Sequence, residues 1–215
     1  MAKTNASLGI LLQRFFSEWL VKRRNAIPDT IKSYNDTWVM FLAHLTAAKK
    51  CRVYKLSLDD VTADAIVDFL DYLESDRGNC YRTQNQRLAA FRSFFKYVVS
   101  VDASRLEQCE RVFSIPLKIY HREVLAYLTS DEIKALLNVL DRSKKSGRKV
   151  YAMLQFMLNT GARASEVTTV QTCDITFAKD NSQVLLHGKG SKDRIVPIWD
   201  DTADLLADLI ARTRR

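Results

Sequence analysis

Apolar residues recur every three or four positions in four stretches of the first half of the chain, the spacing that gathers them on one face of a helix. These stretches are residues 11–19, 31–45, 66–73 and 88–98. The polar segments between them are short, and Gly78 is expected to end a helix. The pattern predicts a compact bundle of four amphipathic helices in residues 1–106.

The helical periodicity is lost over residues 107–127, which Pro116 interrupts. We expect a linker there, followed by a second domain in residues 128–215. Its first helix is marked by Thr129 and, three positions later, Glu132, because these two residue types form a capping box before an apolar helical pattern.

Three short apolar segments follow Asp174 and are typical of β-strands. They are residues 175–177, 184–186 and 195–198, and a last helix is expected over residues 201–211. The predicted fold class is therefore mainly α with a small antiparallel β-sheet (α+β).

The composition excludes several classes of protein. Of the 215 residues, 47% are hydrophobic and 27% are charged, which excludes wholesale disorder. The apolar runs are too short for a membrane span, and the first residues do not resemble a secretory signal. The four cysteines are scattered, so we expect reduced thiols, a cytoplasmic location, no metal and no cofactor.

The charge points to a polyanionic partner. Lys and Arg number 33 against 25 Asp and Glu, a formal net charge of +8. Double-stranded DNA is the expected partner, ahead of a membrane surface. A basic run over residues 142–149 is expected to be a surface loop.

Two expected helix starts carry side chains that suit DNA. Hydroxyls and a lysine at residues 30–33 suit phosphate at a helix N-terminus, and Arg, Asn and Gln at residues 82–87 suit base edges in the major groove. The candidates are Thr30, Lys32, Ser33, Arg82, Thr83, Asn85, Gln86 and Arg87. Taken alone, the second run is more typical of a solvated basic face, and Thr and Ser are also ordinary caps.

Two further segments are more specific. Residues 159–167 read NTGARASEV, with Arg163 after a glycine turn, and residues 187–197 read HGKGSKDRIVP, a hairpin that carries Lys189. Each segment resembles a hallmark of the tyrosine recombinases, the phage-integrase family of site-specific DNA recombinases. The helical bundle resembles the SAM-like core-binding domain of that family, and the chain from residue 127 resembles the opening of its catalytic domain.

The chemistry of these residues fits a phosphodiester. A guanidinium matches two non-bridging oxygens and stays protonated, so Arg163 suits the charge that grows there during attack. The resemblance assigns to Lys189 the proton for the leaving oxygen, with Lys192 as a substitute or as a backbone phosphate contact. Glu166 either orients the guanidinium or is an acid favoured at a helix start.

The resemblance also calls for a His-x-x-Arg box and a tyrosine nucleophile after the hairpin, for strand cleavage and rejoining through a 3′-phosphotyrosyl intermediate. None of the three histidines begins such a box, and all eight tyrosines precede Arg163. We therefore expect a recombinase truncated within its catalytic domain, which binds DNA and is catalytically incompetent alone.

Other interpretations remain open. The chain is alternatively a regulatory, dominant-negative subunit that associates with a full-length recombinase, or a helical adaptor that binds a protein. In a further alternative, a partner chain supplies the missing groups in trans. Because a partial domain leaves apolar surface uncovered, we also expect self-association.

Overall fold

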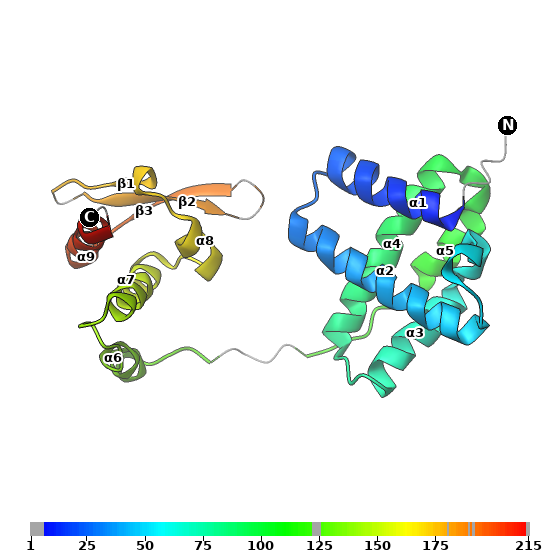
Figure 1. Ribbon diagram of the computed structural model, residues 1–215, viewed down its shortest axis with the longest axis horizontal. Helices are drawn as coiled ribbons and strands as arrows, with labels where there is room; N and C mark the ends of the chain where they lie inside the picture. The colour runs from blue at the N-terminus through cyan, green and yellow to red at the C-terminus, as the bar shows by residue number, and fades with distance from the viewer. Residues whose placement is uncertain (1–6, 122–125, 180, 189, 191, 214–215) are drawn as a thin grey trace. The chain divides into compact units, whose positions relative to one another are not determined.

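The computed structural model describes residues 7–121, 126–179, 181–188, 190 and 192–213 of the chain (Figure 1). The chain divides into two compact units, residues 1–123 and residues 124–215. We call them the first and the second unit and describe each by itself. The described residues form helices and one small antiparallel sheet, which confirms the predicted fold class.

The first unit is a helical bundle, and the four predicted helices are confirmed. The first of them continues from an α-helix into π-helical turns over Phe15–Arg23. The α-helices are α1 (Leu8–Arg14), α2 (Pro28–Lys49), α3 (Ala63–Ser75), α4 (Tyr81–Val101) and α5 (Leu106–Ser114). Short 3-10 turns lie at Val53–Lys55, Leu58–Asp60 and Ala103–Arg105. Gly78, with φ of +60°, lies between α3 and α4, where left-handed backbone favours glycine.

Aromatic rings fill the core of the bundle. The ring of Phe91 on α4 lies 5.2 Å from Trp38 and 4.9 Å from Phe41, both on α2, and 6.1 Å from Phe69 on α3. The four side chains are buried and meet edge to face, an arrangement that stabilises beyond the area buried. Helix α4 therefore holds α2 and α3 together.

Helix α5 corrects the expectation of a linker from residue 107. Cys109 and Val112 are fully buried in the bundle core, and the guanidinium of Arg92 donates a hydrogen bond to the carbonyl of Phe113 (3.1 Å). A helix of two turns presents only a few apolar positions, and charged residues separate them here. Such a short helix gives no recognisable periodicity in the sequence, although one of its faces is apolar and buried.

The described residues of the second unit form four α-helices and the sheet. The helices are α6 (Ser130–Asn138), α7 (Lys145–Thr160), α8 (Ala164–Thr169) and α9 (Asp200–Thr213). The strands β1 (Ile175–Thr176), β2 (Gln183–Gly188) and β3 (Lys192–Pro197) pair antiparallel in the order β1-β2-β3. Because α7 begins at Lys145, residues 145–149 are helical and not part of the surface loop expected there.

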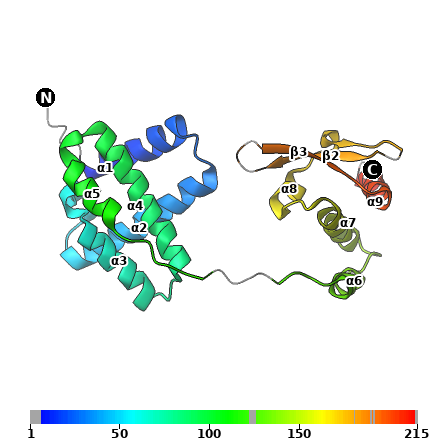
Figure 2. The same cartoon turned by 180° about the vertical axis from the view of Figure 1, so that it is seen from behind.

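The second unit has a small core. Val184 and Leu186 of β2 point from the sheet toward Phe156 of α7 and Ala203 of α9, and all four are buried. Figures 1 and 2 show the three strands on one side of α7, α8 and α9. Helix α6 has no buried residue, and its capping box between Thr129 and Glu132 is present as predicted.

Large apolar side chains remain exposed on the second unit. Val139 is 83% exposed and Trp199 is 65% exposed, and Tyr127 is also exposed. No helix in the described ranges combines the length and the hydropathy needed to cross a bilayer.

Candidate active site

A glycine turn places Arg163 at the start of a helix. Helix α7 ends at Thr160, and Gly161 follows with φ of +62°, a left-handed conformation that favours glycine. Arg163 is the residue before the first turn of α8, and its side chain is 67% exposed. The predicted helix end and the predicted arginine turn are therefore both present.

Glu166 lies in α8, and its side chain contacts the turn that carries Arg163. Its side chain is only 4% exposed. The backbone N–H of Arg163 donates to Oε2 (2.8 Å), and Nη1 of the same arginine donates to Oε1 (2.8 Å). The carboxylate therefore caps the start of α8 and also contacts the guanidinium of Arg163.

Arg194 on β3 donates hydrogen bonds to the same carboxylate. It is not among the site residues predicted from the sequence. Its Nη1 donates to Oε1 of Glu166 (3.0 Å) and its Nη2 to Oε2 (2.8 Å), a bidentate pair. The hydrogen bonds from Arg194 and from the Arg163 backbone lower the pKa of Glu166 to about 2. The register offered a signal: Arg194 lies opposite the buried Leu186, so it belongs to the inward face, where a charge needs a partner.

The β2–β3 hairpin meets the same carboxylate at Gly188. A Cβ atom at Gly188 would lie 2.5 Å from the backbone oxygen of Lys192 and 3.6 Å from Oε1 of Glu166. The end of β2 is thus packed beside Glu166, and Figure 2 shows from behind that α8 adjoins this strand. Lys192 is exposed at the start of β3, and Lys189 lies outside the described residues.

His187, one position before Gly188, lies between two carboxylates. Its Nδ1 is 3.2 Å from Oδ2 of Asp193, its cross-strand partner, and its Nε2 is 3.4 Å from Oδ1 of Asp174. The hydrogen bond with Asp193, and then that with Asp174, raises the pKa of His187 above its ordinary value. No local sequence pattern indicates a role for this imidazole.

The predicted DNA-binding residues of the bundle converge where α2 and α4 begin. Nε2 of Gln86 donates to Oγ of Ser33 (2.8 Å). Nη1 of Arg87 donates to Oγ1 of Thr37 (2.9 Å) and to the carbonyl of Ser33 (3.3 Å). Lys32 and Arg82 are exposed near the starts of the same two helices.

Some of these candidate side chains contact other residues of the bundle or are partly buried in it. The side-chain amide of Asn85 donates to the carbonyl of Lys118 (2.8 Å), and its oxygen accepts from the Lys118 N–H (2.9 Å). Oγ1 of Thr83 lies 3.3 Å from Sγ of Cys80, and Thr30 is half-buried. Asn85 therefore fixes the segment after α5 rather than presenting its amide to a base edge.

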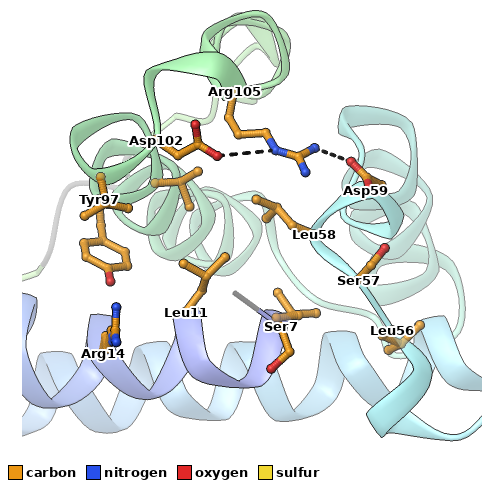
Figure 3. Close-up of a pocket in the computed structure, with 13 residues that line it drawn as sticks. Ser7, Leu11, Arg14, Leu56, Ser57, Leu58, Asp59, Tyr97, Asp102 and Arg105 are labelled. Atoms are coloured by element: carbon orange, nitrogen blue, oxygen red, sulfur yellow. Dashed lines mark hydrogen bonds and ion pairs between the residues drawn. The ribbon is translucent and has the colours of Figure 1, made fainter. Parts of the chain in front are cut away.

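A separate cavity of about 270 Å³ lies in the bundle among α1, α4 and the turn at Leu58–Asp60 (Figure 3). Arg105 pairs with Asp59 and lies 3.9 Å from Asp102, measured from Nε to Oδ2. These ion pairs join the turn before α5 to the turn before α3. None of the predicted site residues that the structure describes lines the cavity.

Metal ligation finds no support in the described residues, where His, Cys, Asp and Glu form no group of three or more placed to hold an ion. At Glu166, two guanidiniums converge on one carboxylate. Such an arrangement leaves an exposed cation, and a cation at a helix start suits a phosphate oxygen.

Comparison with known proteins places both units in one family. Residues 126–215 match the phage integrase family, and residues 11–105 match the phage integrase N-terminal SAM-like domain. The integrase/recombinase y4rD of Sinorhizobium fredii is 39% identical over 204 residues, which cover 95% of this chain and 73% of that protein. Tyrosine recombinase XerC of Bacillus pumilus is 27% identical over 86% of this chain and 57% of that protein.

Solved structures share the fold. The XerH site-specific recombinase bound to palindromic difH substrate matches with a TM-score of 0.66 and 20% identity, over 91% of this chain and 56% of that one. The Tn1549 transposon integrase in complex with transposon right end DNA matches with a TM-score of 0.62 and 17% identity, over 94% and 65%. This chain spans little more than half the length of the XerH chain. On the family matches and the identity to y4rD, the chain belongs to the phage integrase family of tyrosine recombinases.

Proposed function

We propose that this chain binds double-stranded DNA as part of a site-specific recombinase and directs Arg163 to the phosphate at which the strand is broken. The proposal rests on the contacts of Glu166, which lies against both the Arg163 turn and the β2–β3 hairpin. The carboxylate fixes the exposed guanidinium of Arg163, and the hairpin that leads to Lys189 packs against it at Gly188.

The chemistry follows from this placement. The free N–H groups of Arg163 donate to a non-bridging phosphate oxygen and stabilise the charge that grows there during attack. Lys189 gives a proton to the leaving sugar oxygen, and Lys192 contacts a neighbouring backbone phosphate. Glu166 acts through Arg163 and does not touch the DNA.

The bundle supplies the affinity in this proposal. Lys32 and Arg82 are exposed beside Ser33 and Gln86, and this basic surface suits phosphate groups and base edges along a groove. The DNA complexes of XerH and of the Tn1549 integrase support DNA as the partner.

We propose further that the polypeptide of residues 1–215 does not cleave DNA by itself. A covalent 3′-phosphotyrosyl link needs a hydroxyl nucleophile in the site, and the eight tyrosines all precede Arg163. A tyrosine from a further segment or a partner chain would complete the chemistry.

The test combines binding and cleavage. Affinity for a labelled DNA duplex is expected to fall steeply with salt, because phosphate contacts release counterions, and Arg163→Ala is expected to weaken it. Suicide substrates built on candidate sites are expected to give no covalent adduct. Salt-insensitive binding would contradict the DNA role, and an adduct would contradict the incompetence of the isolated chain.

A second proposal concerns assembly. The exposed Val139 and Trp199 of the second unit favour association with another copy or with an intact recombinase, where they would be covered. Light scattering at rising concentration, and co-purification with an intact recombinase, test this. A concentration-independent monomer that fails to co-purify would contradict it.

A further inference from the structure

We propose that Arg194 is a positioning residue for Arg163: it neutralises the carboxylate of Glu166, so that the guanidinium of Arg163 keeps a net positive charge for a DNA phosphate. This inference rests on the proposed function, in which Arg163 contacts the phosphate. Arg194 itself need not touch the DNA.

The contact between Glu166 and Arg163 reduces the positive charge that Arg163 can offer to a phosphate. Glu166 holds Arg163 through its backbone N–H and its Nη1, both at 2.8 Å. A guanidinium and a carboxylate at this distance form a neutral pair, whose attraction for a further anion is largely cancelled. An acid that only oriented Arg163 would therefore weaken the phosphate attraction that the arginine provides.

Arg194 restores a positive charge, because its Nη1 and Nη2 donate to Oε1 and Oε2 of Glu166 at 3.0 and 2.8 Å. The two guanidiniums and one carboxylate sum to a single positive charge. Glu166 is 4% exposed and Arg194 is 35% exposed, whereas Arg163 is 67% exposed. The surplus charge is thus presented to solvent mainly at Arg163.

The position of Arg194 in the sheet adds a geometric role. Arg194 lies on β3 opposite Leu186 of β2, and Gly188 of the same strand packs beside Glu166. The Arg194–Glu166 pair therefore ties the hairpin to α8. It joins the segment that leads to Lys189 to the turn that carries Arg163.

The experiment measures the affinity of the full 215-residue chain for a fluorescein-labelled mixed-sequence DNA duplex as a function of salt. Arg194→Met removes the charge and keeps most of the volume. We expect it to weaken binding about ten-fold and to reduce the salt slope by about one. The matched control is Arg212→Met on α9, which breaks the Arg212–Asp208 pair of the same unit and is expected to change affinity less than about two-fold.

The decisive variant is the double substitution R194M/E166Q. It removes one positive and one negative charge, so the net charge at the site returns to that of the wild type. We expect its affinity to recover to within about three-fold of wild type. A purely structural role predicts the opposite, because both partners of the tie are then lost. Arg194→Lys, which keeps the charge, is expected to bind better than Arg194→Met.

A second readout does not depend on DNA. Carbon-detected NMR of the Glu166 carboxyl is expected to show its pKa near 2 in the wild type and a higher value in R194M. Unchanged titration, a double variant as weak as R194M, or an R194K as weak as R194M would each overturn the inference.

The proposed function fails separately. If wild-type binding does not depend on salt, or Arg163→Ala binds as tightly as wild type, the phosphate role of Arg163 is wrong. If Arg163→Ala weakens binding and R194M does not, only the role of Arg194 is wrong. Thermal unfolding of each variant identifies any that is misfolded, and R194K then provides the comparison.

Discussion

His187 and Asp193 face each other across the β2–β3 ladder, with Nδ1 of the imidazole 3.2 Å from Oδ2 of the carboxylate. Asp174 approaches the other ring nitrogen from the turn before β1, at 3.4 Å. The imidazole thus links both strands of the hairpin to the segment that precedes the sheet. Its protonated form donates to both carboxylates at once.

This arrangement predicts a pH-dependent hairpin. The two carboxylates raise the pKa of His187 above its ordinary value of 6.5, so the folded state favours the protonated ring. The stabilisation is complete below pH 6.5 and is lost as the pH rises through the elevated pKa. His187→Asn is expected to flatten the dependence of the melting temperature on pH above 6.5.

The control for this prediction is His121→Asn, which removes an exposed imidazole from the first unit. Its pH profile is expected to follow that of the wild type. An unchanged profile in His187→Asn would show that the carboxylate contacts do not stabilise the hairpin.

The sequence predicted the elements whose patterns are long or have caps. The aromatic stripes of α2 and α4, the Thr129–Glu132 capping box and the Gly161 helix end are all present. These signals are local, because each depends on spacing within one helix or one turn. The two-turn helix α5 offered too few apolar positions to be recognised.

The candidate site was predicted only in part, for a different physical reason. Arg163 and Glu166 are three positions apart, and a helix start brings them together. Arg194 lies 28 positions after Glu166, and only the folded sheet makes them partners. Likewise, the hydrogen bonds of Asn85 reach Lys118 across 33 positions, so no local pattern reveals them.

Asn85 is predicted to stabilise the bundle rather than to read DNA. Asn85→Ala leaves the N–H and the carbonyl of Lys118 without their side-chain partner, which is expected to cost about 1–2 kcal/mol of unfolding free energy. Gln86→Ala, which loses one exposed hydrogen bond to Ser33, is the matched control and is expected to cost less than about 0.5 kcal/mol. Urea denaturation measures both, and equal losses would contradict the prediction.

Any side chain at Gly188 is predicted to destabilise the hairpin. Alanine there would place its Cβ 2.5 Å from the backbone oxygen of Lys192, so the hairpin must shift. We expect Gly188→Ala to cost about 1–3 kcal/mol and to weaken DNA binding, because the shift occurs beside Glu166. In Gly190→Ala the new Cβ meets no atom within 4 Å, and only the φ of +78° is unfavourable. We expect this variant to lose about 1–2 kcal/mol of unfolding free energy. Weaker DNA binding in Gly190→Ala than in Gly188→Ala would contradict this ranking.

Helix α5 is predicted to contribute to the stability of the bundle. Val112 is fully buried, so Val112→Ala is expected to cost about 1–3 kcal/mol of unfolding free energy. Val101 at the end of α4 is 49% exposed, and Val101→Ala is expected to cost less than about 1 kcal/mol. Equal effects in a urea titration would show that α5 does not dock as the structure has it.

Arg82 is predicted to contact a DNA phosphate from the start of α4, where it is exposed beside the Gln86–Ser33 contact. Arg82→Ala is expected to reduce the slope of log affinity against log salt by about 0.9, the contribution of one phosphate contact. The unfolding free energy is expected to change by less than about 0.5 kcal/mol, because the side chain lies at the surface. The control is Arg111→Ala on α5, which removes the same charge from the exposed Arg111–Glu107 pair and is expected to leave the slope unchanged. If the two variants reduce the slope equally, DNA responds to the net charge of the bundle and not to a surface at the start of α4.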